Sequence, residues 1–333
     1  MKKGKIVTLG EIMLRLSTPG FERFTQTKSF DIEYGGSEAN VAVSLAHLGM
    51  AAEHVTRFPE NDLGKAATQQ LQRYGVITSH ILYGDERMGI YFVENGSMHR
   101  SSRIIYDRFD SAFAHIKKGS VNWDEVFTGA AWFHWSGITP AISKGAAEVC
   151  AEAIDAARKM GLVVSGDINY RRNLWQYGKT AQDIMPGLIR STDMIVAGVA
   201  DIENCTGITG DTFASACGNL IRQYPGVKKI ATTIRQSISS SHNKVAAILW
   251  DGKKLFESKE YDLTHIVDRV GAGDAFMAGL IYGWLNNYDD QQTLEFATAA
   301  GAWKHSVEGD VNLATAPEIA ALVKGENVGK LLR

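Results

Sequence analysis

The sequence predicts one α/β domain over residues 1–333, with a central, mostly parallel β-sheet flanked by helices. Three observations support this fold class. Apolar, β-branched segments alternate with amphipathic helical segments along most of the chain, which is the pattern of β–α–β units. A glycine-rich turn at 271–273 opens an apolar helix, an arrangement suited to binding an anion. Residues of about 12–33 and 89–109 lack the helical period and predict a small β-sheet lid over the site.

The composition argues against several classes of protein. The chain has 333 residues and a formal net charge of −2, so nothing points to nucleic acid or an anionic membrane as a partner. Cys150, Cys205 and Cys217 are dispersed, which predicts neither a disulfide framework nor a structural zinc site and favours a reducing compartment. No segment has the pattern of a signal peptide or the length of a membrane span. We therefore expect a cytoplasmic protein whose ligands are small molecules.

The elements can be justified in chain order from their periodicity and their stop signals. Strands are expected at 5–9, 54–58, 80–83, 194–197 and 228–233, and another begins at 162 and ends in a polar cluster. Helices are expected after Gly36, at 62–74, after Pro140, and at 183–190, 276–285 and 294–305. Hairpin turns are expected at Asn95-Gly96, within the lid, and at Asp251-Gly252. The polar tail after Lys324 is expected to be mobile.

The turn Gly271-Ala272-Gly273 and the acidic residue Asp274 form the first candidate site. Unpaired amides at the start of a helix attract negative charge, and a carboxylate beside them does not suit simple phosphate storage. It does suit a reaction in which Asp274 takes a proton from a hydroxyl while the amides hold a phosphoryl group. An ordinary loop with an acidic helix start is the alternative. The spacing of this turn does not fit a dinucleotide fingerprint, and Gly178-Lys179-Thr180 lacks the earlier glycine of a P-loop.

The pair Gly35-Gly36 precedes another amphipathic helix, and Asn40 lies in its first turns. Two glycines allow a small molecule to approach the backbone closely, and an amide side chain both donates and accepts hydrogen bonds, as a sugar hydroxyl requires. The alternative is a plain helix start.

Together these stretches resemble the PfkB (ribokinase-like) carbohydrate kinases. Residues 268–274 match the C-terminal signature D-x-x-G-A-G-D, and residues 35–40 match the N-terminal signature G-G-x-x-x-N. The resemblance implies a ribokinase-like fold that uses ATP and Mg²⁺, with a monovalent cation as a further candidate. It also implies that Asp274 is the catalytic base and that the amides of Gly271, Ala272 and Gly273 form the anion hole.

The segments SGITPA, DINYRRNLW and YDRFDSA resemble the 2-keto-3-deoxygluconate kinases within that family. This resemblance implies contacts to a sugar acid and to the nucleotide. The implied sugar-acid contacts are Gly35, Gly36, Asn40, Tyr91, Tyr106, Arg108, Arg171 and Asp310. The implied nucleotide contacts are Asn169, Tyr170, Gly271 and Gly273. Many family members have a glycine-rich turn where this chain has Arg235, and we expect Arg235 to lie near the ATP phosphates. Charge agrees, because arginines suit an acid better than a neutral sugar.

Two departures from the family pattern concern the metal and the substrate. The family has an Asn three residues before the acidic residue that organises magnesium. Here Asp201 stands at the acidic position, but Gly198 replaces the Asn. An acidic residue at a simple helix start is the alternative interpretation of Asp201. Neutral-sugar members often carry Asp after the first strand, whereas this chain has Arg15, which leaves a contact between Arg15 and an anionic substrate open.

We therefore expect an ATP-dependent kinase that phosphorylates 2-dehydro-3-deoxy-D-gluconate at its terminal hydroxyl and forms homo-oligomers through the lid. The alternatives are a fructokinase, a 2-dehydro-3-deoxygalactonate kinase, or a non-catalytic sugar-binding protein on the same fold.

Overall fold

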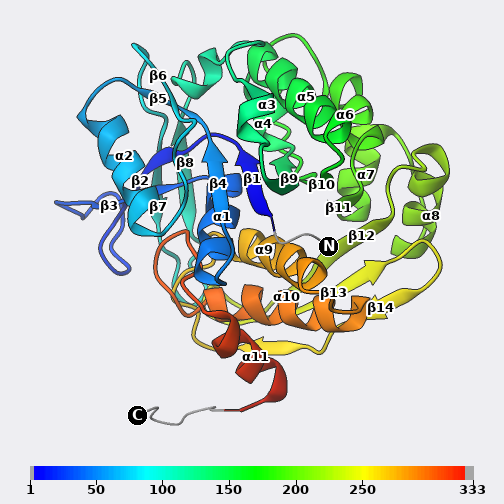
Figure 1. Ribbon diagram of the computed structural model, residues 1–333. Coiled ribbons are helices and arrows are strands. Elements are labelled where there is room, and N and C mark those ends of the chain that lie inside the picture. The colour runs from blue at the N-terminus through cyan, green and yellow to red at the C-terminus, as the bar shows by residue number, and fades with distance from the viewer. Residues whose placement is uncertain (1–3, 327–333) are drawn as a thin grey trace.

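The computed structural model describes residues 4–326, and within them the main element is a nine-stranded sheet (Figure 1). In spatial order its strands are β14 (Leu255–Glu257), β13 (Asn243–Trp250), β12 (Lys229–Ser237), β11 (Met194–Val196), β10 (Val163–Asp167), β9 (Ala130–Ser136), β1 (Lys5–Leu9) and β4 (Ala52–Val55). The strands from β12 to β4 run parallel, while β13, β14 and the short β15 (Tyr261–Leu263) pair in antiparallel fashion. The predicted central, mostly parallel sheet is confirmed.

Helices cover both faces of this sheet, and the strand residues alternate between the two layers. Val7, Phe133 and Ile195 belong to one apolar cluster, whereas their neighbours Ile6, Trp132 and Met194 belong to another. The first cluster is covered by α3 (Trp123–Val126), α5 (Lys144–Lys159), α6 (Ala181–Arg190), α7 (Val199–Thr206) and α8 (Phe213–Gln223). The second is covered by α1 (Ser37–His47), α2 (Asp62–Arg73), α9 (Ala272–Leu285) and α10 (Asp290–Lys304). Burial on both faces explains why these strands are apolar throughout.

Three short helical elements complete the chain. The 3₁₀ helix η1 (Phe113–His115) packs on α5, and α4 (Ile138–Ile142) links β9 to α5. Near the end of the described chain, α11 (Ala316–Lys324) packs on α10. Most of the tail for which mobility was predicted lies outside the described residues. Within residues 4–326 no helix combines the length and apolar character needed to cross a membrane.

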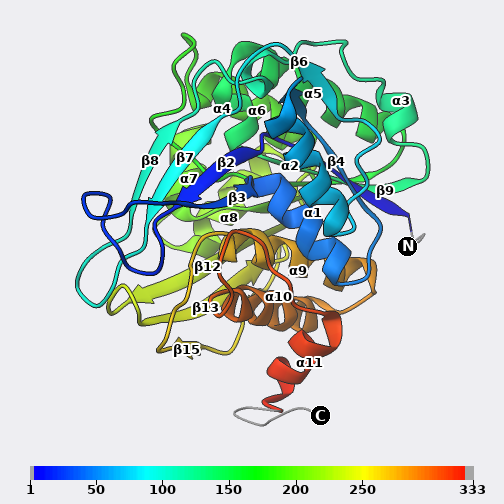
Figure 2. The same ribbon diagram turned by 90° about the vertical axis from the view of Figure 1, so that its left-hand side faces the viewer.

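The predicted lid is a separate four-stranded sheet along one side of the molecule (Figure 2). Its spatial order is β3 (Asp31–Gly35), β2 (Met13–Ser17), β7 (Ile90–Glu94) and β8 (Arg103–Asp107). The first and last pairs are antiparallel, and β2 runs parallel to β7. One row across the sheet joins Glu33, Arg15, Tyr91 and Tyr106.

Two local predictions about the β structure were wrong. The lid hairpin does not turn at Asn95-Gly96: Ser97 and Arg100 exchange backbone hydrogen bonds, so the tight turn is Met98-His99. Met98 adopts a φ of 53° in this turn. Because positive φ values are normally marked by Gly, Asn or Asp, the sequence pattern does not indicate a turn at Met98. The expected strand at 54–58 is divided into the end of β4 and a short strand, β5 (Arg57–Pro59), which pairs with β6 (Leu82–Gly84) in a separate two-stranded sheet.

Candidate active site

The glycine-rich turn before α9 has the geometry of an anion site. Gly271 has a φ of 80°, and a side-chain carbon at this position would overlap the backbone carbonyl of Asp310, so only glycine fits. Within residues 4–326, the amides of Gly271, Gly273 and Asp274 have no hydrogen-bond acceptor, whereas Ala272 N–H donates weakly to the carbonyl of Arg269 at 3.4 Å. The amides free to meet an anion are therefore those of Gly271, Gly273 and Asp274, at the positive end of α9.

The carboxylate of Asp274 is held by the first turns of α1. Ser37 Oγ donates to Oδ1 at 2.9 Å, and Asn40 Nδ2 donates to Oδ2 at 2.8 Å. Burial raises the pKa of Asp274 to about 6, although both hydrogen bonds act to lower it. A carboxylate with this pKa is ionised at neutral pH and is more basic than a free aspartate, which suits a general base. Asn40, expected to contact a sugar, here orients this carboxylate.

Further acidic side chains share the electrostatic surroundings of Asp274. Asp167 ends β10, and burial raises its pKa well above the usual range, helped by the carboxylates of Asp274 and Asp201. The guanidinium of Arg171 opposes these effects at both Asp167 and Asp274. Asp167 was not among the predicted site residues. Its position at the carboxyl end of a parallel strand, where open sheets bind ligands, is the signal that could have identified it.

Asp201 connects α7 to the segment that follows β10. Its Oδ2 accepts a hydrogen bond from Gly198 N–H at 2.9 Å, and its Oδ1 accepts one from Tyr170 N–H at 3.3 Å. Asn169 has a φ of 37°, in the left-handed region, and Asp201 holds the backbone directly after it, where Tyr170 and Arg171 follow. The helix-start role of Asp201 is therefore present, and its assignment to magnesium stays a prediction.

The carboxylates of Asp167 and Asp201 fit a magnesium ion that a nucleotide also binds, rather than one held by the protein alone. Within residues 4–326 no three His, Cys, Asp or Glu side chains are placed to hold a metal ion by themselves. Magnesium bound to a nucleotide needs only one or two protein carboxylates, because phosphates and water fill its other positions. Asp167 and Asp201 supply oxygen donors of this type, and their mutual repulsion would be relieved by a cation.

The predicted lid contacts Tyr91, Tyr106 and Arg108 come together. The two tyrosine rings stack at 5.9 Å, and the Arg108 guanidinium lies 5.9 Å from the Tyr106 ring centre. Tyr106 is 52 % exposed, whereas Arg108 is only 6 % exposed because its Nε and Nη2 donate to the buried carboxylate of Glu11. Glu11 was not identified from the sequence.

Arg108 also lines a cavity of about 250 Å³ between the end of β8 and the loop that includes Leu174 and Tyr177. This loop follows Arg171 directly in the chain. Arg108 and this loop thus line the same space, which is large enough for a small ligand, whereas Arg171 is not among the residues that line it.

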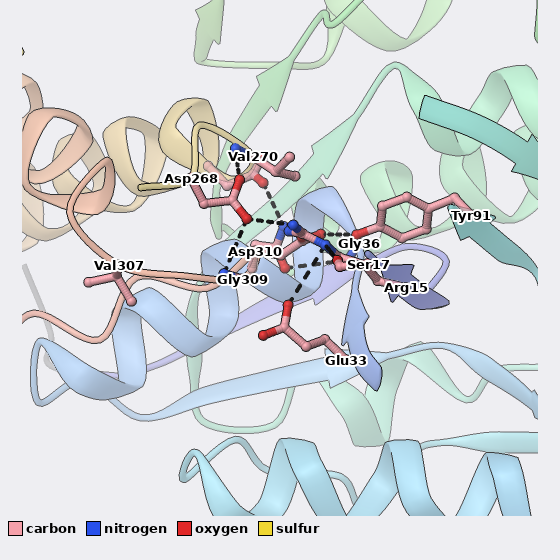
Figure 3. Close-up of polar contacts among 12 residues, drawn as sticks. Arg15, Ser17, Glu33, Gly36, Tyr91, Asp268, Val270, Val307, Gly309 and Asp310 are labelled. Atoms are coloured by element: carbon pink, nitrogen blue, oxygen red, sulfur yellow. Dashed lines mark hydrogen bonds and ion pairs between the residues drawn. The ribbon is translucent and has the colours of Figure 1, made fainter. Parts of the chain in front are cut away.

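Asp310 lies beneath the site in a buried polar network (Figure 3). Its carboxylate accepts hydrogen bonds from Arg15 and from the hydroxyl of Tyr91, and it fills the space that a side chain at Gly35 would occupy. Arg15 is 1 % exposed and also donates to Asp268 at 2.5 Å. Both groups are thus occupied by internal partners. The substrate contact expected of Asp310 stays a prediction, as does the one left open for Arg15.

On the other side of the glycine turn, Arg235 lines a small pocket of about 50 Å³ together with Ala272, Gly273 and Phe276. Burial lowers the pKa of Arg269, and the positive charge of Arg235 lowers it further. The guanidinium groups of Arg235 and Arg269 are therefore close enough to influence each other. Two guanidinium groups near free helix amides favour a polyanionic ligand such as a triphosphate. Arg269 lies within the signature D-x-x-G-A-G-D, but it stands at a position that the signature leaves variable, so a motif search does not identify it.

Comparisons with known proteins agree with this geometry. Residues 3–317 match the family described as pfkB family carbohydrate kinase. The chain is 30% identical over 325 residues to the 2-dehydro-3-deoxygalactonokinase of Haloferax volcanii, covering 98% of each chain. It is 25% identical over 322 residues to the 2-dehydro-3-deoxygluconokinase of Bacillus subtilis, covering 96% of this chain and 95% of the relative.

Among solved structures, the crystal structure of 2-dehydro-3-deoxygluconokinase from Thermotoga maritima is similar, with a TM-score of 0.92 and 41% identity over 97% of this chain and 100% of that chain. Fold, signatures and coverage therefore lead to one conclusion: the chain belongs to the pfkB family of carbohydrate kinases.

Proposed function

We propose that this carbohydrate kinase transfers the γ-phosphoryl group of ATP to the terminal hydroxyl of 2-dehydro-3-deoxy-D-gluconate. The observation that carries the proposal is the pairing of the Asp274 carboxylate with free amides at the start of α9. The sugar acid is favoured because Arg108 lines a cavity and the Arg171 guanidinium acts on Asp274 and Asp167, so positive charge is available for a carboxylate.

The proposed reaction is an in-line displacement. Asp274 takes the proton of the terminal hydroxyl, whose oxygen attacks the γ-phosphorus. The bond between that phosphorus and the bridging oxygen breaks, and ADP leaves with the bonding electrons. The amides of Gly271, Gly273 and Asp274 and the α9 dipole stabilise the phosphoryl charge as it passes between the two oxygens.

Magnesium and nucleotide are assigned by the same proposal. Asp201 and Asp167 would hold Mg²⁺, which would neutralise charge on the phosphates of the nucleotide. Arg235 and Arg269 would meet the polyphosphate beside Gly273. Asn169 and Tyr170 stay candidates for nucleotide contact, on the segment that Asp201 holds through Tyr170 N–H.

A 2-dehydro-3-deoxygalactonate kinase is the second candidate, because the Haloferax volcanii relative bears that name at 30% identity. The two acids differ in the configuration of one hydroxyl. A coupled assay of ADP release over a panel of both acids and fructose tests the proposal. We expect the highest kcat/KM with 2-dehydro-3-deoxygluconate. A clear preference for fructose would reject the proposal that the substrate is a sugar acid.

We also propose that two copies associate through the lid. One face of the lid carries the apolar row Ile32, Leu16, Phe92 and Ile105, in which Ile32 is 63% and Ile105 is 53% exposed. The edge strand β8 is exposed along its whole length. A second copy of the same face would cover both features, which otherwise favour uncontrolled edge pairing.

A further inference from the structure

Lys304 is a buried lysine that the proposed reaction does not use. It ends α10 and has 0% exposure. Its Nζ donates to the main-chain carbonyl of Val307 at 3.0 Å and to that of Asp268 at 3.3 Å. Lysine is rarely buried without a carboxylate partner at hydrogen-bond distance, so a position between carbonyl oxygens requires an explanation.

The two carbonyls belong to the segments that enclose the glycine turn. Asp268 opens that turn, and its Oδ1 accepts a hydrogen bond from Val270 N–H at 2.9 Å. Val307 begins the loop that leads through Gly309 to Asp310 (Figure 3). Within this loop, Gly309 N–H donates to Asp268 Oδ2 at 3.2 Å. The carbonyl of Asp310 packs directly on Gly271. The ammonium group thus joins the two segments between which the turn is held.

The charges of this region are balanced from within the chain. Asp268 and Asp310 are both paired with Arg15, and they also favour the charged form of Lys304, whose pKa is lowered mainly by burial. Main-chain carbonyl oxygens are also the groups that replace water around a potassium ion in selectivity filters. An ammonium group and K⁺ carry the same charge, so either could hold two carbonyl-bearing segments together.

We infer that Lys304 is a positioning residue that acts as an internal monovalent cation: it fixes the glycine turn in the phosphoryl-binding shape, so the enzyme needs no added K⁺. This inference rests on the proposed function to the extent that the turn binds the transferred phosphoryl group. The aliphatic part of Lys304 also fills space, so the test must separate charge from volume.

Three proteins separate these roles when they are assayed in potassium chloride and in choline chloride of equal ionic strength. Wild-type kcat should be the same in both salts. Lys304→Ala removes the charge and leaves room for a cation, so kcat should fall roughly 10- to 100-fold in choline, as expected for a displaced catalytic group, and recover in potassium. Lys304→Met removes the charge but keeps the volume, so the same loss should not be rescued.

Several results would overturn the inference: wild-type enzyme activated by potassium, Lys304→Ala with full kcat in choline, or equal rescue of both variants. Thallium(I) binding followed by thallium NMR gives a readout that needs no turnover. The Lys304→Ala protein should bind thallium and release it to potassium, whereas wild type should not bind it. Thallium binding by wild type at this site would refute the inference even if no sugar were phosphorylated, while inactivity alone would reject only the proposed function.

Discussion

At the scale of single residues, Asp274 determines the pH at which the reaction can proceed. The base must be deprotonated, so kcat/KM should fall as the pH drops below about 6, the pKa set by burial of this carboxyl. Ser37 donates to the ionised form and therefore holds this pKa down. Ser37→Ala should raise the pKa further and move the acid limb to higher pH by up to about one unit.

The check is a pH–rate profile of both proteins, with Ser44→Ala as the control. Ser44 is buried in the same helix but its hydroxyl has no hydrogen-bond partner within residues 4–326, so its removal should leave the profile unchanged. A Ser37→Ala profile that overlays wild type would contradict the assigned hydrogen bond.

Arg108 gives a second prediction at this scale. Arg108→Ala should weaken binding of the sugar acid by about 1.5–3 kcal/mol through loss of a charged hydrogen bond. The same change leaves Glu11 buried without its partner, which perturbs the site by itself. The KM of the Arg108→Ala, Glu11→Gln double variant separates the two effects. Restoration of the wild-type KM in the double variant would show that Arg108 does not touch the acid.

At the scale of elements, the lid is fastened to the catalytic body through Arg15 on β2. The substitution Arg15→Met leaves the buried carboxylates of Asp268 and Asp310 without the guanidinium that both of them pair with. We expect the free energy of unfolding to fall by about 3–5 kcal/mol, the usual effect of breaking a buried pair. Arg87 makes a comparable but exposed pair with Asp107 at the end of β8, so Arg87→Met should cost less than about 1 kcal/mol.

Urea unfolding of the two variants provides the measurement. Equal losses of stability in Arg15→Met and Arg87→Met would show that the buried network does not hold the lid. A large loss confined to Arg15→Met would support the role assigned to this network.

The same elements show what local sequence patterns can predict. The helix after Gly271 and the strands of the sheet were predictable because periodicity and glycine signals are local. The turn at Met98-His99 was not, because it lacks the residues that normally mark a positive φ. The pairing of Arg15 with Asp268 and Asp310 spans 253 and 295 residues of chain, and no local pattern encodes it.

At the scale of the whole molecule, the residues expected to form the site are brought together from both the lid and the main sheet. The sequence led to Asp274, the glycine turn and the lid side chains through family signatures. Ser37 and Glu11 depend on which strand ends and helix starts meet, so they became visible only in the folded chain, whereas the position of Asp167 at a strand end could have identified it.

Association through the lid is the prediction that belongs to this scale. Ile105→Glu places a charge in the proposed interface and should convert a dimer to a monomer in size-exclusion chromatography with light scattering. Leu63→Glu is the control, because Leu63 is similarly exposed, at 44%, but lies on α2 outside the lid. A monomeric wild type, or an Ile105→Glu protein of unchanged mass, would contradict the proposed contact.

The most direct test of the proposed chemistry measures ADP formation by purified wild type and Asp274→Asn with 2-dehydro-3-deoxygluconate, ATP and magnesium. Wild type should form one ADP per phosphorylated sugar acid. Asp274→Asn should keep the fold and the affinity for the sugar acid, but lose roughly 10²–10⁴-fold in kcat, the range for a positioned base. A variant with near-normal kcat would remove Asp274 from proton transfer, and a wild type inactive on every sugar acid would reject the proposed substrate class.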